Sequence, residues 1–361
     1  GIGNGFLQSA LDLMKISALG KVCKAVQAKI PFLTTMAMAE PFAQPAGPES
    51  RSRIDMRSVS LPLGDEHIVT DVLIKEPAPL SGSTAKSSHT VVVFPGNPSV
   101  LPFYRRFMEQ LANRLQDTIS VHAVGHAGFS FKDHNNGRLF SLDEQISLKI
   151  SYMESILAKD PETKLVLLGH SVGAYMVMEI LNQRPDLPIV SNVFLFPALC
   201  NLEVSWPVKV LRTPILYESL GFCISLIPSP IKLLLSKLLP SIQDEATMIG
   251  DHFNSHSVRN GFSLVNHELR QIREFNQSQV KALTKHSDSS LFLFTRSDPY
   301  VGVTLMEHLR SSIPGATHIV YDDLLDVKHA FVMKDSDLVA DTVLTYLDMI
   351  LPGLCPTAES A

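Results

Sequence analysis

The sequence places one serine between two glycines, in the run Gly169-His170-Ser171-Val172-Gly173. An apolar run, Lys164 to Leu168, precedes it, and a helical pattern, Ala174 to Asn182, follows it. This is the G-x-S-x-G pattern in which a serine occupies a tight turn between a strand and a helix. The glycines fit because side chains at those positions would collide with neighbouring backbone. The pattern predicts that Ser171 is a nucleophile.

A serine hydroxyl needs a base to take its proton and a carboxylate to orient that base. In folds with this turn, the carboxylate precedes the histidine and both follow the serine. Asp298 comes just after an apolar run, in a turn stiffened by Pro299. Such an aspartate also starts turns or caps helices. Order and spacing favour Asp298 as the acid over its alternatives, which lie in a loop close before the proposed histidine: Asp322, Asp323 and Asp326.

The chain has 13 histidines, but His329 stands out by its position. It lies late in the chain, on a loop after the last predicted strand and before the closing helix, Leu338 to Ile350. A single histidine is more often a structural residue. Here the position predicts that His329 is the general base, whereas His318 lies within a predicted strand and His308 on a helix.

The negative charge that develops on an attacked carbonyl oxygen needs backbone N–H donors. One donor is expected from the residue after the nucleophile, which is Val172, and one from the loop after an earlier strand. That loop is Pro95-Gly96-Asn97-Pro98, in which Gly96 allows close approach. A simple turn is the alternative for this motif. We expect Asn97 and Val172 to form the oxyanion hole.

Short apolar runs alternate with helical patterns from Ile54 onward, which is typical of a sheet with crossover helices. The helix over Leu142 to Leu157 has its apolar side chains on one face. The pattern predicts an α/β fold with a mostly parallel sheet whose strands are His67–Ile74, Thr90–Phe94, Ser120–Val124, Lys164–Leu168, Asn192–Phe196, Ser290–Thr295 and Thr317–Tyr321.

About ninety residues between the strands at 192–196 and 290–295 contain no clear strand, which is too long for an ordinary crossover. We interpret 200–289 as an inserted helical cap that is apolar at 214–242. Prolines break its apolar part into pieces too short to span a membrane. An interfacial hairpin on a lipid surface and a soluble cap packed on the core both remain open, and the first is favoured because Lys232 and Lys237 can extend to the polar surface of a membrane.

The predicted organisation has four parts: an extension at 1–50, a core formed by 51–199 together with 290–352, the cap at 200–289, and a tail at 353–361. Residues 1–35 are amphipathic and contain lysines but few acidic residues. They are interpreted either as a targeting segment or as an upstream extension. The Pro/Ala/Gly-rich stretch 41–48 favours the extension.

The composition excludes some classes of protein. The net charge is −5 and no basic run is present, so a nucleic-acid partner is not expected. The four cysteines lack metal-ligand spacing. The mean hydropathy of +0.14 is high for a soluble protein. The extra apolar surface must therefore be buried or contact another apolar surface. Neither a metal nor an organic cofactor is expected.

Several motifs together resemble the lipid droplet-associated hydrolase family. They are Phe94-Pro95-Gly96-Asn97-Pro98 followed by Phe103-Tyr104, Leu168 to Tyr175, Asp298, and His329-Ala330-Phe331-Val332. The resemblance covers roughly residues 60 to 350. One departure is Ser99, where the family usually has glycine, and it bears on the shape of the oxyanion loop.

The resemblance implies the α/β-hydrolase fold and a serine esterase that cleaves lipid esters, such as sterol esters or other neutral lipids. It also implies a location at lipid droplets and the endoplasmic reticulum, with a cytosolic fraction. An alternative is that the chain organises droplets by binding lipid or partners through its apolar cap, with weak or absent activity. The acyl chain and the oligomeric state are not determined by the sequence.

Overall fold

The computed structural model describes most of the chain from Ile54 onward. The described residues are 54–77, 89–115, 119–202, 213–225, 254–295, 298, 300–301, 303–313, 315–316, 318–322, 327–352 and 354. The predicted extension at 1–50, much of the apolar stretch at 214–242 and most of the predicted tail lie outside these residues. The four-part organisation therefore stays a prediction.

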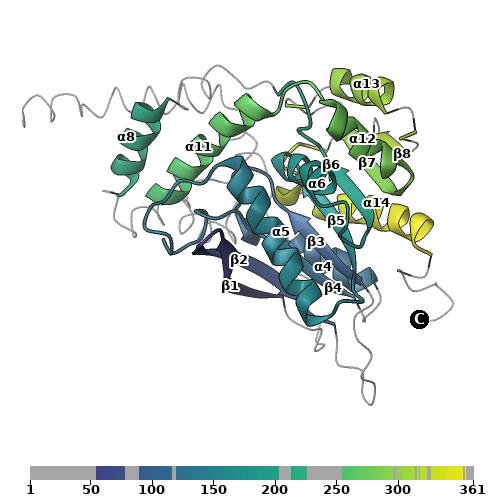
Figure 1. Cartoon of the computed structure of the whole chain (residues 1–361), viewed down its shortest axis with the longest axis horizontal. Coiled ribbons are helices and arrows are strands. Elements are labelled where there is room, and N and C mark those ends of the chain that lie inside the picture. Colours follow the sequence, from purple (N-terminus) through teal and green to yellow (C-terminus); the bar gives the residue numbers. More distant parts are fainter. Residues whose placement is uncertain are drawn as a thin grey trace, which may run out of the picture.

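The centre of the molecule is an eight-stranded sheet with the order β1-β2-β4-β3-β5-β6-β7-β8 (Figure 1). The pairs β1–β2 and β2–β4 are antiparallel, and the remaining pairs are parallel. The strands are β1 (Asp55–Leu63), β2 (Glu66–Lys75), β3 (His89–Phe94), β4 (Ser120–Val124), β5 (Lys164–His170), β6 (Ile189–Leu195), β7 (Ser290–Thr295) and β8 (His318–Asp322).

The middle strands are apolar on both faces because helices cover both faces of the sheet. In β3, Val91, Val92, Val93 and Phe94 are all fully buried. Register places Phe94 of β3 opposite Gly169 of β5. The loops that leave these two strands therefore start at the same edge of the sheet.

The helices form a layer on each face of the sheet. One hydrophobic core joins the sheet to α5, α6, α12 and α13, and a second joins it to α4 and α14; Figure 1 shows α5 and α6 in front of the strands. The bounds of these helices are α4 (Arg105–Arg114), α5 (Leu142–Lys159), α6 (Val172–Gln183), α12 (Gln277–Lys285), α13 (Val303–Ser312) and α14 (Ser336–Ile350), with short 3₁₀ turns at η1 (Leu101–Tyr104), η2 (Ser287–Ser289) and η3 (Phe331–Met333).

Two further helices of the predicted cap segment are α8 (Pro214–Ser225) and α11 (Ser255–Gln271). They pack against each other, and α11 also touches α5. Figure 1 shows both beside the sheet rather than within its helical layers. The described part of 200–289 beyond residue 202 is helical, apart from short connections, up to the start of β7 at Ser290.

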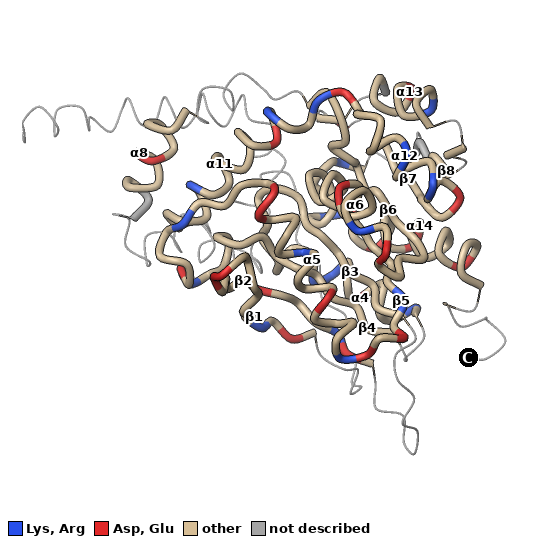
Figure 2. Tube along the Cα trace, viewed as in Figure 1, with Lys and Arg blue, Asp and Glu red and all other residues tan. Residues whose placement is uncertain are grey.

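The fold class and most predicted elements are confirmed. The strands over 120–124 and 290–295 begin and end as predicted, and α5 begins at Leu142, where the Ser141–Glu144 capping box satisfies its first N–H groups. The strand β1 was not predicted. Its side chains are mostly exposed because it is the edge strand, so it lacks a buried apolar run. Among the described residues, Figure 2 shows positive and negative residues intermixed along the chain.

Candidate active site

Ser171 lies at a sharp turn between β5 and α6, as the motif predicts. Its backbone has φ 55° and ψ −120°, a region that residues with a side chain rarely adopt. A Cβ at Gly169 would lie 2.5 Å from the Gly173 carbonyl oxygen, and a Cβ at Gly173 would lie 2.2 Å from the Phe94 carbonyl oxygen. Only glycine fits at either position, so the strained turn holds the Ser171 side chain at the edge of the sheet.

Asp298 and His329 form a hydrogen-bonded pair. The His329 Nδ1 atom lies 2.7 Å from Asp298 Oδ2, and the two side chains are 15% and 1% exposed. The other carboxylate oxygen accepts from the backbone N–H groups of Tyr300 and Val301, at 2.8 and 3.0 Å. An ionised carboxylate only accepts hydrogen bonds, so His329 carries its proton on Nδ1. Its Nε2 atom is thereby left able to accept a proton.

The pair is connected to the serine turn through His170, the neighbour of Ser171. The His170 Nε2 atom lies 2.9 Å from the backbone oxygen of His329, and the two imidazole rings are 5.2 Å apart. Among the described contacts, none is a hydrogen bond between the Ser171 hydroxyl and the His329 ring. Such a bond is often long in the absence of substrate and shortens when substrate binds.

The two predicted oxyanion residues lie next to Ser171, one in the chain and the other on a neighbouring loop. Val172 is the first residue of α6, so its N–H has no acceptor within the helix. Asn97 lies in the loop after β3, and a Cβ at the preceding Gly96 would come within 3.1 Å of Ser171 Cβ. The N–H of Gly96 already donates to the Tyr104 hydroxyl, at 2.8 Å. Of these two adjacent N–H groups, Asn97 is therefore the better candidate donor.

His170 and Tyr104 are further functional candidates, which the sequence indicated only as members of the family motifs, without a role. The Tyr104 hydroxyl lies 2.6 Å from His170 Nδ1, so it accepts from Gly96 N–H and donates to the imidazole. The other nitrogen of His170 then donates to the His329 carbonyl. Burial, the largest cause, holds the pKa of His170 well below its ordinary value, which keeps the ring neutral for this relay. The motif leaves position 170 unspecified, so spacing gave no signal for it.

Glu268 of α11 is a candidate that the sequence did not indicate. Its side chain is buried and accepts a hydrogen bond from Asn97 Nδ2 at 2.9 Å. Burial raises the pKa of Glu268 to about 7, while the Asn97 hydrogen bond and the positive charge of protonated His329 act in the opposite direction. Nothing in the sequence marks Glu268, because it lies far from every motif.

The two rival histidines have other partners. His308 pairs with Glu274 and stacks on Phe275, and the His318 ring packs against Tyr346. Asp322 is the last residue of β8, whereas Asp323 and Asp326 lie outside the described residues. Across the described part of the chain, no three His, Cys, Asp or Glu side chains are grouped as metal ligands.

A family model described as "Lipid-droplet associated hydrolase" matches residues 87–332. The chain belongs to this family. Among curated relatives, the lipid droplet-associated hydrolase of Dictyostelium discoideum is 28% identical, covering 74% of this chain and 90% of the relative. The proteins of the same name from rat and human are 25% and 22% identical and cover 74% and 70% of this chain, and 87% and 84% of their own lengths.

Solved structures show that this family member has the α/β-hydrolase fold. The peroxisomal α/β-hydrolase Lpx1 of Saccharomyces cerevisiae matches with a TM-score of 0.59 at 11% identity, covering 84% of this chain and 90% of that protein. The haloalkane dehalogenase DatA of Agrobacterium tumefaciens matches with a TM-score of 0.57 at 12% identity, covering 84% of this chain and all of that protein. At these identities the likeness concerns the fold alone.

The raised pKa of Glu268 gives this lipid-droplet associated hydrolase a testable dependence of stability on pH. Between pH 4.5 and about 7 the folded protein keeps a proton that the unfolded chain releases, so the Glu268 contribution lowers the free energy of unfolding as the pH rises. The full effect is about 3 kcal/mol. Glu268→Gln does not titrate and should lose less stability than wild type between pH 5 and pH 8 in urea unfolding. Parallel curves for the two proteins would contradict this origin.

Proposed function

We propose that this hydrolase cleaves carboxylic esters of lipids through Ser171, His329 and Asp298. The observation that carries the proposal is the buried Asp298–His329 pair. The backbone oxygen of His329 is hydrogen-bonded to His170, the residue before the strained Ser171. A histidine held in one tautomer by a buried carboxylate, close to a serine in this turn, is the arrangement that activates a hydroxyl for acyl transfer.

The proposed reaction has two steps. His329 Nε2 takes the Ser171 proton as the oxygen attacks the ester carbonyl, and the resulting oxyanion accepts hydrogen bonds from the N–H groups of Asn97 and Val172. The protonated histidine then gives its proton to the leaving alcohol, and an acyl-serine remains. Water, deprotonated by His329, attacks the acyl carbon, and the histidine returns this proton to the Ser171 oxygen as the acid leaves. No metal or organic cofactor takes part.

A lipid substrate is supported by the relatives and by the exposed apolar side chains of α8. The curated relatives carry the name lipid droplet-associated hydrolase. On α8, Ile215 is 76% exposed and Phe222 is 64% exposed; seven residues apart, they lie on one face of the helix. We propose that this face contacts a droplet or membrane surface and that sterol esters or other neutral lipids are the substrates. The locations that follow are the lipid droplet, the endoplasmic reticulum and partly the cytosol.

A fluorophosphonate probe tests the proposed function. The probe should label the wild-type protein at Ser171, identified by mass spectrometry of the labelled peptide, and heat-denatured protein should not be labelled. The same preparation is then assayed on a panel of emulsified cholesteryl ester, triacylglycerol and a short-chain ester. Absence of both labelling and turnover would reject the hydrolase mechanism.

A second candidate function is droplet organisation through the apolar cap with little turnover. The exposed face of α8 favours it, since the chemistry at Ser171 does not require that surface. None of the described helices has the length and apolar character to cross a bilayer. Labelling of Ser171 without turnover of any ester on the panel would favour this function over lipid ester hydrolysis.

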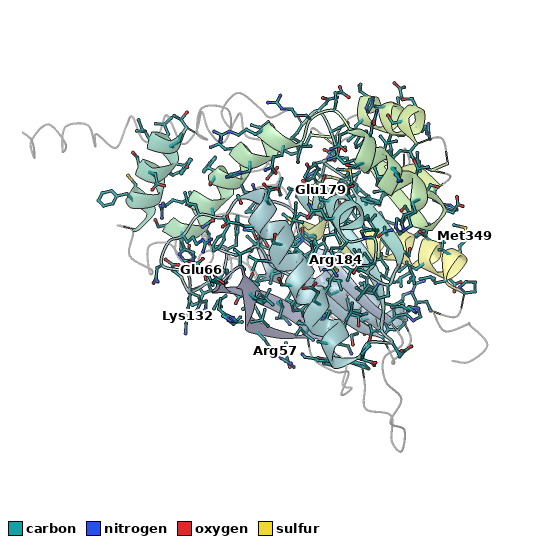
Figure 3. All side chains as sticks on the ribbon, viewed as in Figure 1. Arg57, Glu66, Lys132, Glu179, Arg184 and Met349 are labelled. Atoms are coloured by element: carbon teal, nitrogen blue, oxygen red, sulfur yellow. The ribbon has the colours of Figure 1, made fainter. Side chains whose placement is uncertain are left out.

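The surface role of α8 predicts a large loss of droplet binding when Ile215 and Phe222 are both replaced by aspartate. Each buried apolar side chain contributes about 1.5–3 kcal/mol, so binding to phospholipid-coated triolein droplets should weaken at least about tenfold in flotation assays. Met349→Asp is the control: Met349 is 57% exposed on α14, and Figure 3 shows it at the opposite end of the molecule from α8. Equal binding by both variants would remove α8 from the contact.

A further inference from the structure

The side chain of Asn97 is held by the helix α11. Its amide nitrogen has two hydrogens, and both have acceptors on this helix: the backbone oxygen of Gly261 at 3.0 Å and Glu268 Oε1 at 2.9 Å. Gly261 and Glu268 are seven residues apart, so they lie on one face of α11. The loop that carries a candidate oxyanion donor is thus bound to a helix far away in the sequence.

The helix that holds Asn97 is itself fixed at other points. The Asn260 side chain accepts from Phe140 N–H at 3.1 Å and donates to the Arg138 carbonyl at 3.0 Å. Arg259 forms a two-point ion pair with Glu218 of α8. These contacts anchor α11 independently of Asn97, so the helix can impose a position on the oxyanion loop rather than follow it.

The side chain of Glu268, on α11, is buried. Among the described side chains, its hydrogen-bond partner is Asn97. The charge of protonated His329 lowers the pKa of Glu268, against the larger effect of burial. A buried carboxyl group is costly unless its hydrogen bonds are made. Glu268 therefore gives the oxyanion loop a buried hydrogen-bond partner on α11.

We propose that Glu268 is a positioning residue that holds the Asn97 side chain and thereby sets the direction of the Asn97 N–H toward the oxyanion. The helix α11 and the oxyanion loop then move together. Displacement of α11 by a lipid surface or a bulky substrate would therefore change the position of the Asn97 N–H in the oxyanion hole. This inference rests on the proposed serine hydrolase function. It adds Glu268, which lies outside the triad, and through it a connection from α11 to the oxyanion hole.

Kinetics of two Glu268 variants test the proposal on a soluble short-chain ester. Glu268→Ala removes the acceptor, and we expect kcat to fall about 10- to 100-fold with KM changed less than about threefold, since a misplaced donor weakens transition-state binding. Glu268→Gln keeps an acceptor oxygen of the same reach and should restore most of the rate. The split between kcat and KM, together with this rescue, distinguishes positioning from a general loss of structure.

Glu179→Ala is the matched control. Glu179 is also a buried glutamate, and it accepts from Gln279 of α12 at 2.6 Å; Figure 3 shows it on the α6 side of the molecule. Its side chain accepts hydrogen bonds from Asn182, Gln183 and Gln279, which lie outside the oxyanion loop, so its replacement should lower the melting temperature but leave kcat within about twofold. A comparable kcat loss in this control, undiminished kcat in Glu268→Ala, or failure of Glu268→Gln to restore the rate would each overturn the proposal.

Hydrogen exchange provides a readout that needs no activity. The peptide covering residues 95–104 should exchange faster in Glu268→Ala than in wild type, and at the wild-type rate in Glu268→Gln. Unchanged exchange in Glu268→Ala would reject the link between α11 and the loop. If the wild type shows neither labelling nor turnover, the proposed function fails on its own, and the exchange result still decides whether Glu268 positions the loop.

Discussion

Replacing Ser171 with alanine is expected to lower kcat for ester hydrolysis by about 10⁴-fold or more, with no loss of fold. The acyl-enzyme route requires the hydroxyl, and the remaining oxyanion donors supply only a small part of the acceleration. Alanine has a Cβ in the same place as serine, so the φ 55° turn is no more strained than before. The measurements are kcat on a short-chain ester and covalent labelling by a fluorophosphonate.

Ser147→Ala is the control for this experiment. Ser147 lies on the exposed side of α5, where its hydroxyl donates to the Asp143 backbone oxygen. It should be labelled and turn over substrate as wild type does. Hydrolysis that persists undiminished in Ser171→Ala would show that another group performs the reaction, and the assignment of Ser171 would be wrong.

Replacing Asp298 with asparagine is expected to lower kcat by about 10⁴-fold, the loss typical of a triad whose histidine is held in the wrong tautomer. An asparagine side-chain oxygen can still accept from Tyr300 and Val301 N–H, so the turn should persist. Its NH₂ group, however, would face His329 Nδ1 as a donor. The imidazole then carries its proton on Nε2, where it cannot accept one from Ser171.

The loss should appear in kcat and in the rate of fluorophosphonate labelling, while the melting temperature changes by only a few degrees. Asp337→Asn is the control, because Asp337 forms an exposed ion pair with Arg106 and such pairs contribute little to stability. A variant with Asp298 replaced that retains most of its activity would move the orienting role to another carboxylate, and the residues between β8 and His329 would then be the place to search.

The nucleophile turn could be predicted from the sequence because its constraints are local. An apolar strand, two glycines that admit no Cβ and a helix start within a few residues of Ser171 leave little choice of conformation. The same holds for β3, β5 and β7, whose unbroken apolar runs indicate strands buried on both faces. The edge strand β1 was missed for the opposite reason: most of its side chains face solvent.

Only some of the residues around Ser171 could be predicted from the sequence. Chain order and strand ends indicated Asp298 and His329, and the structure brings these two together at 2.7 Å. Their catalytic roles and those of Asn97 and Val172 stay predictions. No role was predicted for His170, Tyr104 or Glu268, because a hydrogen bond across 66, 159 or 171 residues leaves no periodic signal in the sequence.

The sequence by itself determined the alternation of strands and helices, the strained serine turn and the family resemblance, since these depend on residues close together in the chain. Only the tertiary structure decided which distant polar groups meet at the edge of the sheet. Burial forces each of those groups to find a partner, and packing of α11 over the loop after β3 selects Glu268 for Asn97. Such pairings are set by the register and packing of whole elements, which no local pattern specifies.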